Sequence, residues 1–194
     1  AAGVYTTNKV CGAPIKVDRA HLADGYAQAI VVNSGNANTC AANGVALAEE
    51  CCELVGKALD IDAMDVLPAS TGVIGQRLNI ECIEEHLPEL KLEDNASEKA
   101  NRAIMTTDTH KKEYAIQFEL GGKVCTVGAI GKGSGMIAPN MATMLAFYTT
   151  DAAVSPALLE KALKTVVPGT YNQMSVDLDT STNDTLIIMA SGLA

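Results

Sequence analysis

The residue with the clearest chemical potential is Thr143, which follows a glycine-dense stretch, GKGSGMIAPNMA, over residues 131–142. A small residue, Ala142, precedes it, and the apolar run MLAFY follows it. This arrangement suits a chain that cuts itself between Ala142 and Thr143 and so frees the Thr143 amine. A threonine hydroxyl is a weak nucleophile alone, and a neighbouring α-amine of pKa roughly 7.7–8.0 can act as its base. We therefore predict that Thr143 is both the processing site and the catalytic centre.

The same stretch has two other interpretations, a phosphate cradle and a flexible turn. A P-loop needs Ser or Thr directly after Gly-Lys, whereas Gly133 follows Gly131-Lys132, so we reject nucleotide binding. The glycines and Pro139 could equally mean only irregular backbone. Spacing alone does not decide between that turn and a self-cleaving segment.

Three further polar segments could carry chemistry. Ser70-Thr71-Gly72 follows a predicted strand, where backbone and hydroxyl donors can form an oxyanion hole, although an ordinary turn is favoured on residues alone. Thr106-Thr107-Asp108-Thr109 follows a predicted helix, and such residues more often close a turn than bind a substrate. The acid-rich stretch 177–184 suggests a cation, but it lacks the EF-hand glycine and closing glutamate, so a polar turn is favoured.

The composition excludes several classes of protein. The chain has 194 residues, 48% of them hydrophobic and 19% charged, which fits a globular fold with a core. Its net charge of −9 argues against a nucleic-acid partner, which needs a basic face. No apolar run reaches the roughly 18 residues of a membrane helix, and no secretory signal is visible. Both ends are apolar sequence at the edge of predicted elements, so we expect a fragment truncated at both ends.

The six cysteines are expected to be reduced thiols rather than disulfides. No CxxC pair is present, and the three histidines are not in HExxH spacing, so we predict no metal site.

Periodicity and turn residues indicate a mixture of strands and helices. Ser155 and Pro156 mark the start of one helix, Ser97 is a candidate cap for another, and Gly121-Gly122 marks a hairpin turn. The predicted strands cover 26–33, 65–68, 143–150 and 184–190, the hairpin covers 113–130, and the helices cover 41–59, 80–87, 97–105 and 155–167. Because strands and helices do not alternate strictly, we predict a layered α/β fold with mixed, partly antiparallel sheets.

Taken together, these segments resemble the ornithine acetyltransferase family, the bifunctional glutamate N-acetyltransferases of arginine biosynthesis. The motifs that carry the resemblance, in family order, are AAGVYTTNKV…AP, VVNSGNAN, ASTGVIG, IMTTDT, GKGSGMIAPNMATML and DTSTNDT. The resemblance implies the α/β/β/α-type sandwich that this family shares with the self-processing aminopeptidases. It also implies one catalytic domain over 1–194, with 1–142 in an alpha chain and 143–194 beginning a beta chain.

The resemblance also implies roles for individual residues. Thr143 becomes the nucleophile, and the Ala142–Thr143 bond becomes the cut bond. Thr71 and Gly72 match the family's oxyanion-hole pair, and Thr106 and Lys132 match substrate-binding positions. Lys132 offers a cation for a substrate carboxylate.

The reaction implied is ping-pong acetyl transfer from N-acetylornithine to glutamate, with acetyl-CoA as a further candidate co-substrate and no cofactor. The implied partners are the protein's own two chains, as a heterotetramer, in the cytoplasm or the mitochondrial matrix. Leu178 stands where the family usually has glycine, and His110-Lys111-Lys112 replaces x-Pro-Lys. Two alternatives stay open, a self-processing aminopeptidase or amidase that gives acyl groups to water, and an inactive fragment.

Overall fold

The computed structural model describes residues 1–138 and 144–194, which contain seven strands and five α-helices. The strands are β1 (Ala2–Tyr5), β2 (Ala29–Asn36), β3 (Val66–Val73), β4 (Lys112–Leu120), β5 (Lys123–Lys132), β6 (Leu145–Thr150) and β7 (Thr185–Ala190). The α-helices are α1 (Ala13–His21), α2 (Gly44–Leu59), α3 (Ile80–His86), α4 (Ser97–Ile104) and α5 (Pro156–Val166).

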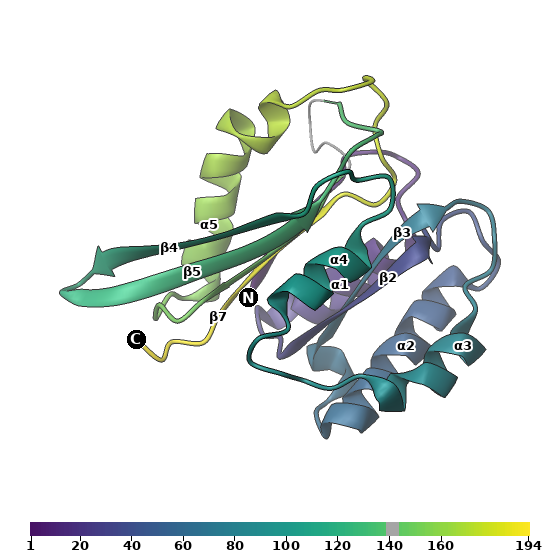
Figure 1. Cartoon of the computed structure of the whole chain (residues 1–194), viewed down its shortest axis with the longest axis horizontal. Coiled ribbons are helices and arrows are strands. Elements are labelled where there is room, and N and C mark those ends of the chain that lie inside the picture. Colours follow the sequence, from purple (N-terminus) through teal and green to yellow (C-terminus); the bar gives the residue numbers. More distant parts are fainter. Residues whose placement is uncertain (139–143) are drawn as a thin grey trace.

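The strands form two sheets. The larger has the order β1-β7-β6-β5-β4, in which β6 and β7 are parallel and the other neighbours antiparallel. The smaller is the parallel pair β2-β3. The β4–β5 hairpin extends to one side, away from β2 and β3 (Figure 1).

The core lies between the two sheets and between each sheet and its helices. Successive side chains of a strand point to opposite faces, so each strand can bury residues in two layers. Leu67 and Ala69 of β3 pack against Leu145, Phe147 and Ile187 of the larger sheet. The outer face of the small sheet packs on α1 and α2, where Val66 contacts Val17, Ala48, Cys52 and Val55. The outer face of the large sheet packs near α5, where Ala146 and Leu186 lie against Leu163.

The order of layers is therefore helix, sheet, sheet, helix, with α5 on one outer side and α1 and α2 on the other (Figure 1). This confirms the predicted α/β/β/α sandwich with mixed sheets. All six cysteines are free thiols.

The two parallel strands run further than the sequence predicts. The predicted strands end at residues 33 and 68, but the pairing of β2 with β3 continues through Ser34–Thr71 and Gly35–Gly72. Gly72 has φ +131°, and a Cβ there would lie 2.2 Å from the Gly35 carbonyl carbon. Only glycine allows the two backbones to come this close at Gly72. Glycines that in the sequence suggest a turn therefore allow close pairing of β2 with β3.

Two elements, β1 and α1, were not predicted. The strand β1 has only four residues and is held by its antiparallel pairing with β7. The apolar face of α1 includes Asp18, which is fully buried and breaks the periodicity.

The predicted helix caps have mixed outcomes. Ser155 does cap α5 by accepting a hydrogen bond from the Leu158 N–H. The Ser97 prediction is wrong, because Ala96 occupies the cap position of α4.

Candidate active site

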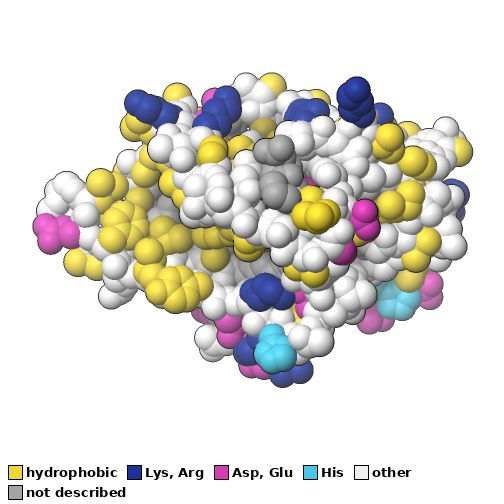
Figure 2. All heavy atoms as spheres, turned by 90° about the horizontal axis from the view of Figure 1, so that it is seen from above, with side chains coloured by type: hydrophobic (Ala, Val, Ile, Leu, Met, Phe, Trp, Pro, Cys, Tyr) yellow, Lys and Arg dark blue, Asp and Glu magenta, His cyan; other side chains and the backbone are white. Residues whose placement is uncertain are grey.

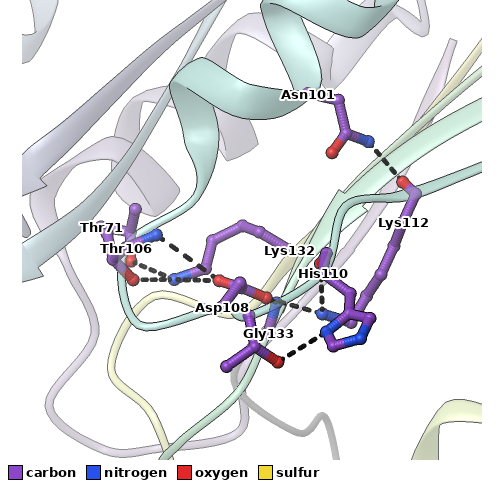
Figure 3. Close-up of polar contacts among 9 residues, drawn as sticks. Thr71, Asn101, Thr106, Asp108, His110, Lys112, Lys132 and Gly133 are labelled. Atoms are coloured by element: carbon purple, nitrogen blue, oxygen red, sulfur yellow. Dashed lines mark hydrogen bonds and ion pairs between the residues drawn. The ribbon is translucent and has the colours of Figure 1, made fainter.

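Three of the predicted site residues converge on one point. Thr71 lies near the end of β3, Thr106 lies in the loop after α4, and Lys132 is the last residue of β5. The Lys132 Nζ donates to the Thr106 Oγ1 at 2.7 Å and to the Thr71 Oγ1 at 3.2 Å (Figure 3). The structure therefore brings together residues that lie 61 and 26 positions from Lys132 in the sequence.

The direction of these hydrogen bonds follows from the groups involved. An ammonium group has three protons and no lone pair, so the Thr71 and Thr106 oxygens must be acceptors. The proton of each hydroxyl is then available for a second partner. Because Lys132 is only 3% exposed, its charge acts on these hydroxyls with little screening by water. The cluster thus presents two polarised O–H donors backed by one buried cation.

Asp108 completes the cluster, and the sequence did not single it out as a functional residue. Its side chain is fully buried, and its Oδ2 lies 3.9 Å from the Lys132 Nζ. Its Oδ1 accepts from the Gly133 N–H at 2.7 Å and from the Lys112 Nζ at 2.7 Å. Asp108 therefore lies in the turn after α4, as predicted. Its carboxylate also binds the first residue of the loop after β5, Gly133, and provides a negative charge near Lys132 (Figure 3).

Burial and charge act in opposite directions on these two groups. Burial raises the pKa of Asp108, but hydrogen bonds from Lys112 and Gly133 outweigh it and hold that pKa below its ordinary value. Burial lowers the pKa of the Lys132 ammonium, and Asp108 partly offsets this. Each charge is thus favoured by the presence of the other.

Beside Lys132 lies a cavity of about 300 Å³. Its wall includes Lys132, Gly133, Ile137, Met144, Tyr148 and Tyr171. The cavity therefore connects the buried cation with the backbone that directly follows Thr143. Figure 2 shows hydrophobic side chains gathered at the β4–β5 end of the face that it draws.

The remaining predicted residues have different positions. Gly72, next to Thr71, is exposed, whereas Thr71 is buried. Ala142 and Thr143 lie outside the described residues, so their predicted roles stay predictions. The predicted hairpin ends at residue 130, but β5 continues through the first two residues of the glycine-dense stretch and pairs with β6 up to Lys132–Leu145.

The acid-rich stretch forms no cluster of acids. Asp177 and Asp184 instead accept hydrogen bonds from separate backbone N–H groups. Within residues 1–138 and 144–194, no group of three or more His, Cys, Asp or Glu side chains could hold a metal ion. No helix in those ranges is long and apolar enough to cross a membrane.

The layers and the cluster define the class of protein first. The α/β/β/α sandwich with a mixed sheet is an N-terminal-nucleophile-type fold, and in this chain a Lys–Thr–Thr cluster lies beside its glycine-rich loop. Residues 1–194 match the ArgJ family over their whole length, and the chain belongs to that family.

Individual relatives agree with this assignment. The chain is 45% identical to the arginine biosynthesis bifunctional protein ArgJ of Lactococcus lactis over 194 residues, which are 100% of this chain and 49% of that protein. It is 46% identical to the glutamate N-acetyltransferase of Methanocaldococcus jannaschii over 199 residues, which are 100% of this chain and 50% of that protein. The chain thus spans about half the length of the curated relatives it matches.

A solved structure is also similar. The crystal structure of the arginine biosynthesis bifunctional protein ArgJ from Bacillus halodurans superimposes with a TM-score of 0.68 at 41% identity. The match covers 73% of this chain and 76% of that chain.

Proposed function

We propose that the protein containing this chain is a glutamate N-acetyltransferase of arginine biosynthesis that uses Thr143 as its nucleophile. The observation that carries the proposal is the buried Lys132 cluster, which presents the Thr71 and Thr106 hydroxyls beside a cavity that reaches Met144. Membership of the ArgJ family and relatives with this named activity support it.

The first step is self-cleavage. The Thr143 Oγ attacks the Ala142 carbonyl carbon, the Ala142–Thr143 C–N bond breaks, and the hydroxyl proton passes to the Thr143 nitrogen. Water then hydrolyses the resulting ester, which leaves an Ala142 carboxylate and a free Thr143 amine and hydroxyl. Residues up to 142 and from 143 onward become two chains, and we propose that two copies of each assemble as a heterotetramer.

The second step is acetyl transfer. The Thr143 amine takes the hydroxyl proton as Oγ attacks the acetyl carbonyl carbon of N-acetylornithine. The bond to the ornithine nitrogen breaks, that nitrogen takes the proton, and acetyl stays on Thr143 as an ester. The glutamate amine then attacks the ester carbon, and the proton it loses restores the Thr143 hydroxyl.

The cluster has a defined part in both steps. An oxygen that becomes negative in the tetrahedral intermediate needs preorganised donors, and loss of one such donor costs about 10²–10³ in kcat. We assign this role to the Thr71 hydroxyl and the Gly72 N–H. A substrate oxygen at Thr106 would accept a hydrogen bond from the Thr106 hydroxyl, which the Lys132 cation polarises. Lys132 thus contributes to substrate binding through Thr106. The proposal also includes acetyl-CoA as a second acetyl donor and no cofactor. It places the protein in the cytoplasm or the mitochondrial matrix.

The test uses the natural full-length protein. Mass spectrometry is expected to find two fragments, the second beginning at Thr143, while a Thr143→Ala variant stays uncut. The processed protein is expected to move acetyl from N-acetylornithine to glutamate. Acetate release at full rate without glutamate would instead identify an amidase, and a folded, processed sample without either activity would refute the proposal.

The oxyanion assignment has its own variants. Thr71→Val removes the hydroxyl and is expected to lower kcat about 10²–10³-fold with little change in KM. Thr71→Ser keeps a hydroxyl and should restore most of the rate. Thr165→Val, which removes an exposed hydroxyl on α5, is the control.

A further inference from the structure

The acid-rich stretch 177–184 contacts both flanks of the segment that contains the Ala142–Thr143 bond. On the N-terminal flank, the Asp177 carboxylate accepts from the Met136 N–H at 2.6 Å and from the Ile137 N–H at 2.8 Å. The Ile137 carbonyl in turn accepts from the Val176 N–H at 2.8 Å. The backbone just before the segment is therefore bound by both a side chain and the main chain of residues 176–177.

The C-terminal flank is held in a similar way. The Asp184 Oδ1 accepts from the Met144 N–H at 2.9 Å, and the Met144 carbonyl accepts from the Thr185 N–H at 2.9 Å. Both backbone groups of Met144, the residue directly after Thr143, are thus fixed by residues 184–185. The parallel pairing of β6 with β7 starts at the next residue, Leu145 with Thr185.

Asp184 is the unusual member of this pair of acids. Its side chain is buried, and its Oδ2 has no hydrogen-bond partner within residues 1–138 and 144–194. Burial raises the pKa of Asp184 to about 7, and the hydrogen bond from the Met144 N–H opposes that rise only in part. No charged side chain in the described ranges contributes to this pKa. A buried carboxyl oxygen without a partner is costly, so its retention calls for a reason.

We propose that Asp177 and Asp184 are positioning residues for self-cleavage, which hold the two flanks of segment 138–143 at a fixed separation. The inference rests on the proposed function, because it concerns the same scissile bond. Intramolecular attack depends on a near-attack geometry of the reacting atoms, and a chain fixed at both ends has fewer conformations to lose in reaching it. Neither acid touches the reacting atoms through the contacts described, since each acts on the backbone of a flanking residue.

The ionisation of Asp184 adds a pH dependence. An ionised carboxylate accepts a charge-assisted hydrogen bond from the Met144 N–H, roughly twice as strong as a neutral one. Protonated Asp184 holds Met144 more weakly. Self-cleavage is therefore expected to slow as the pH falls through about 7, the pKa of Asp184.

The test follows the rate of scission of the full-length precursor between pH 5.5 and 8.5, with fragments identified by mass spectrometry. Asp184→Asn keeps an acceptor oxygen but removes the charge, and it should lose the inflection near pH 7. Asp184→Ala and Asp177→Ala should slow scission about 10–100-fold at pH 8. Asp179→Asn, an exposed acid in the same stretch, should cleave at the unaltered rate.

The outcomes separate this inference from the proposed function. If the unaltered precursor is not cut before Thr143, the proposed function fails. If it is cut, but Asp184→Asn keeps the inflection near pH 7, or folded Asp177→Ala cleaves at the unaltered rate, the positioning role is refuted. Circular dichroism of each variant establishes folding. Because Asp177 is exposed and Asp184 is buried, variants of Asp177 are expected to disturb the fold less than variants of Asp184.

Discussion

Replacing Asp108 with asparagine is expected to destabilise the fold mainly by leaving the Lys132 cation buried without its countercharge. The Asp108 Oδ2 and the Lys132 Nζ lie 3.9 Å apart, and the two side chains are 0% and 4% exposed. Two unit charges at about 4 Å attract by about 4 kcal/mol at an effective dielectric constant of 20. Removal of one partner of a buried pair costs about 3–5 kcal/mol. The pair of Asp108 with the half-exposed Lys112 adds at most about 1 kcal/mol.

The assay is urea unfolding of the full-length chain carrying Thr143→Ala, so that self-cleavage does not mix species. Far-UV circular dichroism is the signal, because it follows the helices and strands of the whole fold. A double-mutant cycle of Asp108→Asn with Lys132→Met isolates the pairwise term, which is expected to be about 2–4 kcal/mol. A coupling below about 0.5 kcal/mol would refute the view that Asp108 neutralises Lys132.

The pH dependence of this effect has a definite sign. Because the folded-state pKa of Asp108 lies below its ordinary value of 3.8, its contribution is fully present above that value. It is lost as the pH falls through the lowered pKa. The difference between the parent and Asp108→Asn should therefore be full at pH 7 and shrink below about pH 4.

Two backbone predictions test the fold around the site. Gly72→Ala should lower the free energy of unfolding by about 3–5 kcal/mol, because its Cβ would lie 2.2 Å from the Gly35 backbone. Gly75→Ala, with φ +85° and open space around it, should lower it by only about 1–2 kcal/mol. Thermal unfolding measures both, and equal losses would contradict the close approach at Gly72. Leu178 has φ +65° and is 71% exposed, so Leu178→Gly should stabilise the fold by about 0.5–1 kcal/mol, while Leu90→Gly, at φ −73° and 74% exposed, should destabilise it by a similar amount. A loss of stability in Leu178→Gly would show that the leucine side chain contributes more than its backbone conformation costs.

The Leu178 position shows how a sequence departure acquires a structural meaning. The sequence resemblance places a glycine there in most of the family, and the structure shows the left-handed backbone that favours one. In the other departure, His110-Lys111-Lys112 in place of x-Pro-Lys, the change is Lys111 for proline, and the Lys111 ammonium pairs with Glu98 and Glu113. Both departures therefore lie in loops next to the site.

Local rules were sufficient where one element decides its own structure. The Gly121-Gly122 turn has φ +61° and +80°, as a tight hairpin requires, and Ser155 with Pro156 begins α5 as predicted. The collinear motifs likewise determined the family and, with it, the α/β/β/α class. The candidate nucleophile Thr143 came from sequence alone, and its role stays a prediction.

Only the tertiary structure decided which distant side chains meet. The stacking of two sheets and the turn after α4 bring Thr71, Thr106 and Asp108 to Lys132, and no spacing rule encodes these contacts. Asp108 and Asp184 resemble ordinary turn residues in the sequence, because local patterns carry no information about which carboxylates become buried. Burial decides their chemistry, since it strengthens every charge interaction inside the fold and penalises each charge left without a partner.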